Sequence, residues 1–222
     1  MKRSTMVILL VLAILLIGAG LVVGNGLGWS YSPVSGAYET LGDYPPGEIT
    51  AIRAELLSSS VRVYESWSDD VLEVEGSGRA ARGVMVVRDG DTLVLSESEP
   101  KGMARFFSRD RYNDYVVLWL PEDYAGTLTL STVSGDVSLG SVDTPMTRVS
   151  LSTVSGDADV YDSKLDELSI ETVSGDIWAD SLKVNRLTLN SVSGDIRGSA
   201  KGLQGEAKIE VSTVSGDVSF ER

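Results

Sequence analysis

Apolar residues recur two positions apart through the second half of the chain, which is the period of a β-strand that buries one face. One such pair stands before each of five copies of the sequence Val-Ser-Gly-Asp. The five pairs are Leu128 and Leu130, Val149 and Leu151, Leu168 and Ile170, Leu187 and Leu189, and Ile209 and Val211. Strand-forming patterns also fill the region from Glu48 onward, and no stretch of it has a helical period.

The five copies of the motif follow one another at a nearly constant interval. Their glycines, which are separated by 21, 19, 19 and 22 residues, are Gly135, Gly156, Gly175, Gly194 and Gly216. An interval of about 20 residues is long enough for one coil of a solenoid, in which each repeat packs only on its neighbours. The sequence therefore predicts an all-β fold, a parallel β-solenoid with coils of about 20 residues.

The alternation changes phase once in each repeat. Leu130 and Val133 are three positions apart, so the inward face changes at Ser131–Thr132 if Val133 and Val137 both point inward. A strand whose inward face changes must bend or bulge. Gly135 then takes an inward position, where its missing side chain permits close approach of another backbone. We interpret the motif as a corner that serves stacking.

A hairpin geometry is the alternative for the same motif. Ser-Gly can form a two-residue turn, which would make the region an antiparallel meander. That register would place Val133 opposite Asp136 on one face, and the same mismatch would recur in every repeat. The solenoid avoids this mixture and is favoured. Upstream, the segment "GVMVVRDGDTLVLSES" predicts a hairpin that turns at Asp89-Gly90 or Gly90-Asp91.

The N-terminus has the pattern of a membrane anchor. Residues 6–23 contain no charge, and they span about 27 Å as a helix at ~1.5 Å per residue. Lys2 and Arg3 favour a cytoplasmic N-terminus. The alternative is a cleaved signal peptide with a small-residue site at Gly18-Ala19-Gly20. We expect a transmembrane anchor or signal at 1–25, a Gly- and Pro-rich linker at 26–47, and an extracytoplasmic repeat domain at 48–222, clearest over 126–222.

The composition excludes several kinds of site and partner. The chain has 222 residues and no cysteine or histidine, which removes disulfides, zinc-type ligands and the commonest general base. Its formal charge of −13 disfavours nucleic acid as a partner. No nucleotide-binding, nucleophile-elbow or zinc pattern occurs, so we expect no enzyme and no cofactor. An aspartate-based β-helix enzyme acting on polysaccharides is the remote alternative.

The aspartates of the motif form one candidate site. Stacked at about 4.8 Å, neighbouring carboxylates would repel unless water, hydrogen bonds or a cation relieved them. Hydrogen bonds from backbone N–H groups or hydroxyls are the simpler solution, and a calcium column is the alternative. The aspartates concerned are Asp136, Asp157, Asp176, Asp195 and Asp217.

Two further groups of residues are candidate binding surfaces. Trp178 and Arg197 belong to an outward column two residues after the aspartates, where they could form a cation–π contact or recognise a glycan or protein. The alternative for Trp178, and the simpler one, is a surface aromatic side chain that packs under a loop. The second group is a basic and aromatic cluster that suits anionic envelope polymers or caps the solenoid. It comprises Lys101, Arg105, Phe106, Phe107, Arg109, Arg111, Tyr112 and Tyr115.

The strand-turn-repeat sequence "VVLWLPEDYAGTLTLSTVSGDV" behind a membrane segment resembles the bacterial β-strand-repeat family known as "putative adhesins". The likeness covers roughly residues 48–222. It implies a β-solenoid of the cell envelope and carries over no catalytic residue. We expect a module anchored in the cell membrane through residues 6–23 that binds a protein or glycan ligand. A sensor or scaffold in an envelope-stress response, acting through a membrane partner, is the alternative.

Overall fold

The structure is a computed structural model, and it describes residues 38–45, 47–66, 71–97, 114–203 and 205–221. These residues form 16 strands in one mixed sheet and a single short helix, α2 (Ala80–Gly83). The strands are β1 (Glu39–Tyr44), β2 (Ala51–Leu56), β3 (Ser60–Glu65), β4 (Leu72–Gly76), β5 (Val84–Asp89), β6 (Thr92–Glu97), β7 (Tyr115–Leu120), β8 (Thr127–Thr132), β9 (Val137–Gly140), β10 (Arg148–Thr153), β11 (Ala158–Tyr161), β12 (Lys164–Thr172), β13 (Ile177–Ser191), β14 (Ile196–Lys201), β15 (Lys208–Thr213) and β16 (Val218–Glu221). The prediction of an all-β fold is confirmed.

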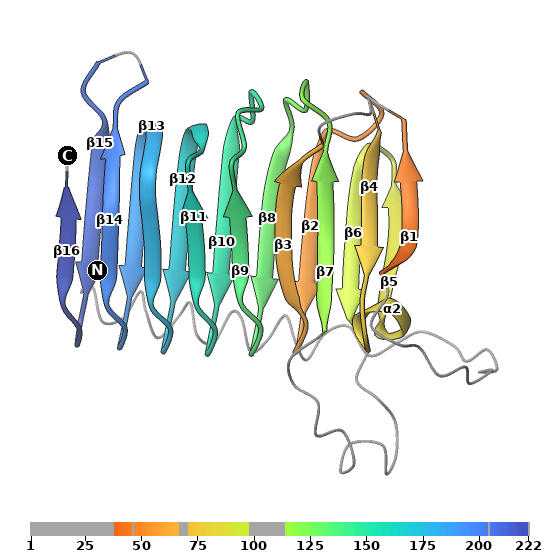
Figure 1. The fold of residues 1–222 in the computed structure, drawn as a ribbon, viewed down its shortest axis with the longest axis horizontal. Coiled ribbons are helices and arrows are strands. Elements are labelled where there is room, and N and C mark those ends of the chain that lie inside the picture. The colour runs from red at the N-terminus through yellow and green to blue at the C-terminus, as the bar shows by residue number, and fades with distance from the viewer. Residues whose placement is uncertain (1–37, 46, 67–70, 98–113, 204, 222) are drawn as a thin grey trace, which may run out of the picture.

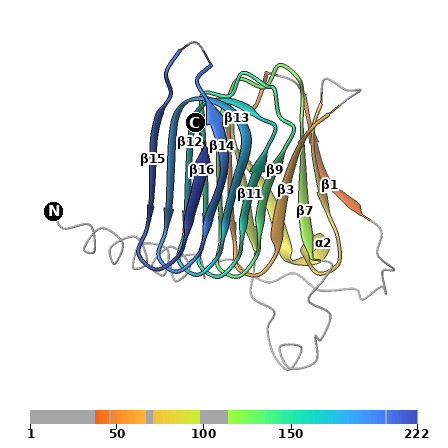
Figure 2. The same cartoon turned by 60° about the vertical axis from the view of Figure 1, so that its left-hand side comes forward.

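The strands stand side by side in two walls that face each other across the core (Figures 1 and 2). One wall has the order β5, β6, β2, β8, β10, β12, β13 and β15. The other has the order β1, β4, β7, β3, β9, β11, β13, β14 and β16. The long strand β13 contributes to both walls, with Ile177–Asp180 pairing with β11 and Lys183–Asn190 pairing with β12.

The repeats are stacked coils in matched register. Val149 lies beside Leu128 on one side and Leu168 on the other, and all three side chains are buried. Pairing is parallel from the β6–β7 coil to the β15–β16 coil. The motif copies therefore lie as neighbouring rungs, and the hairpin alternative for them is wrong. Equivalent residues stack because each rung buries its apolar pair against the same pair on the next rung.

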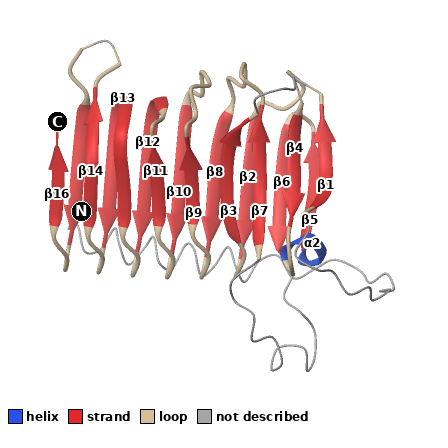
Figure 3. Ribbon diagram, in the orientation of Figure 1, coloured by secondary structure: helices blue, strands red, loops and turns tan. Residues whose placement is uncertain are grey.

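The N-terminal end of the stack departs from a purely parallel solenoid. There β1 pairs with β4, β4 with β7, and β5 with β6, all antiparallel (Figure 3). The β5–β6 hairpin turns at Gly90-Asp91, the second of the two predicted turns, and Gly90 has φ of 64°. Antiparallel strands and α2 cover this end of the stack, which a row of parallel coils would leave as open strand edges. The prediction of an entirely parallel solenoid is therefore wrong at this end.

The order of coils in space differs from their order in the chain. Strand β2 lies between β6 and β8, so the β2–β3 coil is inserted between the β6–β7 coil and the first motif coil. Strand β1 lies within 26–47, the segment predicted as a linker, and its pairing with β4 shows that the sheet begins there. The predicted anchor at 1–25 lies outside the described residues, and among those described no helix is long and apolar enough to span a membrane.

The corner of each repeat differs in detail from the predicted phase change. The buried residue is Thr132, which is 1% exposed, whereas Val133 is only half-buried. In the last coil the equivalent Val214 is 74% exposed. The prediction that Val133 points inward is wrong because the hydroxyl of Thr132 finds hydrogen-bond partners inside the corner. Gly135 does take an inward, buried position, as predicted.

Candidate ligand-binding face

The threonine or serine that directly precedes Val-Ser-Gly-Asp joins two coils. Thr153 Oγ1 accepts the N–H of Gly156 at 3.0 Å in its own coil, and it donates to the carbonyl oxygen of Gly135 in the preceding coil at 3.0 Å. Thr172 and Ser191 make the same pair of contacts in their coils, and Thr132 makes it with the carbonyl oxygen of Ser59 in place of a motif glycine. The hydroxyl thus satisfies a donor and an acceptor that burial would otherwise leave unpaired.

The glycine of the motif is required by the backbone of the preceding coil. A β-carbon on Gly175 would stand 1.7 Å from the carbonyl oxygen of Gly156, and one on Gly156 would stand 1.9 Å from that of Gly135. No Cβ fits at such distances, so the coils approach this closely only because the position is glycine.

The aspartates of the motif form a hydrogen-bonded ladder. The backbone N–H of each motif aspartate from Asp157 to Asp217 donates to Oδ1 of the aspartate in the preceding coil, at 2.8–3.0 Å. At the start of the ladder, Ser60 Oγ accepts from the N–H of Asp136. The carboxylates of Asp136, Asp157, Asp176 and Asp195 are thus engaged in stacking by backbone hydrogen bonds, as the sequence favoured, and Asp217 in the last coil contributes its N–H. Within the described ranges no group of three or more acidic side chains is placed to hold a metal ion.

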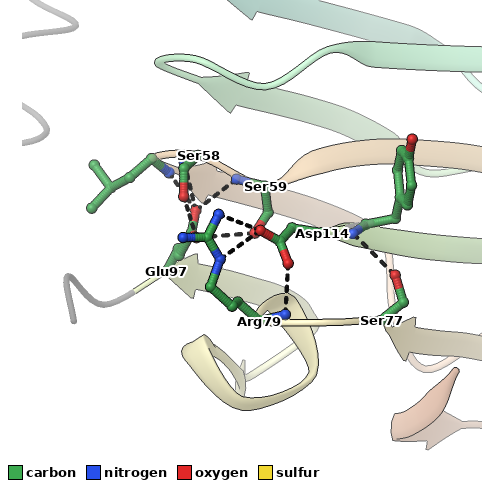
Figure 4. A network of polar contacts seen from close by, with 8 residues as sticks. Ser58, Ser59, Ser77, Arg79, Glu97 and Asp114 are labelled. Atoms are coloured by element: carbon green, nitrogen blue, oxygen red, sulfur yellow. Dashed lines mark hydrogen bonds and ion pairs between the residues drawn. The ribbon is translucent and has the colours of Figure 1, made fainter. Parts of the chain in front are cut away.

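A second polar cluster lies at the same corner of the first two coils (Figure 4). The Glu97 carboxylate accepts the backbone N–H groups of Leu57, Ser58 and Ser59 at 2.8–3.0 Å, and the hydroxyls of both serines. Burial raises the pKa of Glu97, but the N–H donors outweigh it and hold that pKa below its usual range. Nearby, Arg79 pairs with the buried Asp114. Because these carboxylates have their hydrogen-bond and ion-pair partners within the chain, we interpret the cluster as structural.

The outward face of the second wall carries aromatic and acidic side chains in two rows. One row runs across the strands through Arg62, Ser138, Asp159, Trp178 and Arg197. The adjacent row, two residues further along each strand, runs through Trp119, Tyr64, Gly140, Tyr161 and Asp180. We call this surface the aromatic face. Side chains of different coils meet on it because the coils stack in register.

The centre of the aromatic face is hollowed. Asp159, Val160, Tyr161, Trp178 and Asp180 line an open depression of about 360 Å³. Trp178 is 57% exposed and Tyr161 is 43% exposed. Tyr161 leans across Gly140, since a β-carbon there would stand 2.4 Å from the Tyr161 hydroxyl. A larger residue than glycine at 140 would push this ring aside.

A second hollow, of about 350 Å³, adjoins the first through their shared residue Asp159. Arg62 lies over the ring of Tyr115 at 3.8 Å from its centroid. The rings of Tyr64 and Trp119 are 5.2 Å apart, and Trp119 Nε1 donates to Glu75 at 2.9 Å. These contacts fix the aromatic side chains on a rigid sheet.

The two carboxylates of the first hollow have different environments. Burial, followed by the charges of Asp157 and Asp136, raises the pKa of Asp159. In contrast, the hydroxyl of Ser199 donates to Asp180 at 2.6 Å and lowers the pKa of that carboxyl. Asp180 is thereby oriented and kept charged, and Asp159 faces the hollow with neighbours of its own sign.

The predicted binding residues fall on this face only in part. Trp178 is exposed at the hollow, and Arg197 is its neighbour in register. The guanidinium of Arg197 pairs with Asp195 at 2.7 Å and not with the ring of Trp178. Among the described residues, the cation–π contact joins Arg62 to Tyr115. Of the basic and aromatic cluster, only Tyr115 lies within the described residues. The members that lie outside them are Lys101, Arg105, Phe106, Phe107, Arg109, Arg111 and Tyr112.

The sequence reasoning missed the row of Tyr161 and Asp180. Reading each repeat two residues beyond the Trp178 column would have found it, because strand residues two apart share a face. No repeat pattern points to the other residues of the face, because the coils that carry them lack the motif. These residues are Arg62, Tyr64 and Trp119.

Comparison with solved structures shows which folds the chain resembles. A crystal structure of a protein described as a "putative cell adhesion protein" from Clostridium sporogenes has a TM-score of 0.53 at 11% identity, and the match covers 84% of this chain and 99% of the other. A "putative adhesin" from Bacteroides fragilis has a TM-score of 0.45 at 17% identity, with 84% and 97% covered. The first likeness shows a shared fold.

Among curated proteins, none matches the chain. A family model does match, over residues 49–222, which include the motif coils and the aromatic face. The match agrees with the resemblance drawn from the repeated motif. The chain belongs to the Toastrack DUF4097 family.

Proposed function

We propose that the protein is an adhesion or ligand-binding module of the cell envelope, and that it binds through the aromatic face. The observation that carries this proposal is the exposure of Trp178 and Tyr161 above a hollow whose rim holds Asp159 and Asp180. Large aromatic side chains beside a few polar groups are typical of binding sites. A rigid sheet supports them, so little conformational entropy is lost when a ligand binds.

The proposed role is binding without catalysis. Support comes from the use of the repeated polar residues, since the motif threonines and aspartates hydrogen-bond to neighbouring coils. A hydroxyl or carboxylate committed in this way is a poor nucleophile or base. The description of the Clostridium sporogenes protein as a cell adhesion protein agrees with a binding role.

The proposed location is the outer side of the cell membrane. Residues 6–23 would anchor the chain, with Lys2 and Arg3 on the cytoplasmic side and the coils outside. This arrangement presents the aromatic face to polymers and proteins of the envelope. A sensor or scaffold role would use the same exposure but needs a membrane partner.

Binding of the full chain, purified in detergent, to isolated cell-envelope material and to immobilised glycans tests the proposal. We expect a double variant, Trp178→Ala with Tyr161→Ala, to lose tenfold or more in affinity. Tyr38→Ala is the matched control because Tyr38 is 47% exposed and lies outside the aromatic face. Equal binding by the double variant and the unmodified protein would refute the aromatic face as the binding surface.

A further inference from the structure

The first hollow has an alternating arrangement of two aromatic and two acidic side chains. Asp159 pairs with Trp178 across β11 and β13, and Tyr161 pairs with Asp180 across the same two strands. Each aromatic ring therefore has a carboxylate beside it on the neighbouring strand and another two residues away on its own strand. Paired residues on one face of a sheet have Cβ atoms about 5 Å apart, so all four side chains can contact one small group.

The charge around this hollow is one-sided. Of the described residues that line it, two are acidic and none is basic. Asp157 and Asp136 add negative charge next to Asp159, as the cause of its raised pKa indicates. The two arginines of the same row have partners of their own: Arg197 pairs with Asp195, and Arg62 lies over Tyr115 in the second hollow, from which its charge also acts on Tyr161.

We infer that the group bound in this hollow is an organic ammonium cation. This inference rests on the proposed function and specifies the ligand of the same site. Exposed faces of tryptophan and tyrosine attract cations through their ring quadrupoles, and aromatic cages of this kind recognise alkylammonium groups. Asp180, oriented by the hydroxyl of Ser199, and Asp159 supply the opposite charge.

Other ligand classes fit the hollow less well. An anion would be repelled by Asp159 and Asp180 and by the −13 charge of the chain. A neutral sugar could stack on Trp178, but it would leave the like-charge repulsion around Asp159 unrelieved. The same face already holds one cation on an aromatic ring, Arg62 on Tyr115, so its geometry suits this contact.

A polymer of amino sugars is the source that this hollow favours, because the exposed rings of Trp178 and Tyr161 can stack on a sugar ring while the carboxylates face its amine. A lysine side chain is the alternative outcome of the test. Glucosamine oligomers and N-acetylglucosamine oligomers of equal length form a matched pair, because they share the sugar ring and differ in the charge of the amine. A trilysine peptide represents the lysine side chain, and tetramethylammonium chloride represents the cation alone. Sodium chloride at equal concentration controls for ionic strength.

Calorimetric titration of the full chain with these four probes tests the inference. We expect tetramethylammonium and the glucosamine oligomer to bind, the latter at least tenfold more tightly than its acetylated partner. Tighter binding of glucosamine than of trilysine would identify the sugar polymer as the source, and the reverse would identify the peptide. Asp180→Asn and Trp178→Ala should each weaken ammonium binding about three- to thirtyfold. Trp178→Phe should keep part of it, and the distant Asp123→Asn should change nothing.

The outcomes separate this inference from the proposed function. If charged and acetylated oligomers bound equally, and Trp178→Ala lost both, the inference that the hollow binds an ammonium group would be overturned. The aromatic face would remain the binding surface. Absence of heat with tetramethylammonium and with both amine-bearing probes would also overturn it. Circular dichroism of each variant checks the fold, and an Asp180→Asn protein that folds normally yet binds ammonium unchanged would count against the inference.

Discussion

The carbonyl oxygen of Gly156 lies 1.7 Å from the point where a β-carbon on Gly175 would stand. This closeness connects two successive coils at the corner of the repeat, where Thr172 Oγ1 also donates to the same oxygen. The Val-Ser-Gly-Asp motif is therefore a stacking device, and each of its polar or small residues has a partner in a neighbouring coil. The surface for a ligand lies elsewhere, on the sheet face that carries Trp178.

Replacing Gly175 with alanine should destabilise the stack severely. The new methyl group would overlap the backbone of Gly156, and the two coils would have to separate and lose their corner hydrogen bonds. We expect a loss of about 3 kcal/mol or more in the free energy of unfolding, measured by urea denaturation. Gly83→Ala is the control, because nothing lies within 4 Å of a β-carbon there. Similar stabilities for the two variants would contradict the close approach.

Replacing Thr153 with valine removes a hydroxyl without changing the shape of the side chain. The N–H of Gly156 would lose its acceptor, and the carbonyl of Gly135 would lose a donor, both inside the corner. We expect a cost of about 1–3 kcal/mol in the same measurement. Thr129→Val on the exposed face of β8 should cost little, since its side chain faces solvent. If both variants unfolded at the same urea concentration, the hydroxyl would not join the coils.

Asp159→Asn should stabilise the protein near neutral pH. Burial and the neighbouring carboxylates raise the pKa of Asp159 in the folded state, so its ionisation disfavours folding. That penalty is present above the folded-state pKa and absent below the ordinary value of 3.8. We expect a melting temperature higher by about 1–3 °C at pH 7, with no difference from the unmodified protein near pH 3. A variant less stable at pH 7 would refute this account.

Glu97→Gln should show the opposite dependence on pH. The N–H donors lower the pKa of Glu97 in the folded state, so the charged form stabilises the fold above the ordinary value of 4.5. That stability is lost as the pH falls through the lowered, folded-state pKa. We expect the variant to lose about 1–3 kcal/mol at pH 7 and to approach the unmodified protein in acid.

Glu122→Gln is the control for this prediction, because Glu122 is exposed in a turn. Thermal unfolding of both variants across the acid range measures the difference. A constant gap between Glu97→Gln and the unmodified protein at every pH would show that the charge of Glu97 does not contribute.

The sequence by itself determined the repeating part of the fold. Each coil has the same apolar pair and the same Thr/Ser, Gly and Asp positions, and identical rungs stack best on one another, so local pattern and tertiary packing agree. The hairpin at Gly90 followed from its turn residues for the same reason. The choice of Thr132 over Val133 as the buried residue was not visible, because it depends on hydrogen bonds to Ser59 and Gly135.

Only the tertiary structure decided the order of the first coils and the composition of the binding face. The β2–β3 coil lies between strands that follow it in the chain, and no local pattern encodes pairing across such a separation. Tyr161 and Asp180 meet because two coils share a register, and Tyr64 and Trp119 meet because β3 lies beside β7. A face assembled from different coils depends on which strands are neighbours, and folding of the whole chain fixes that choice.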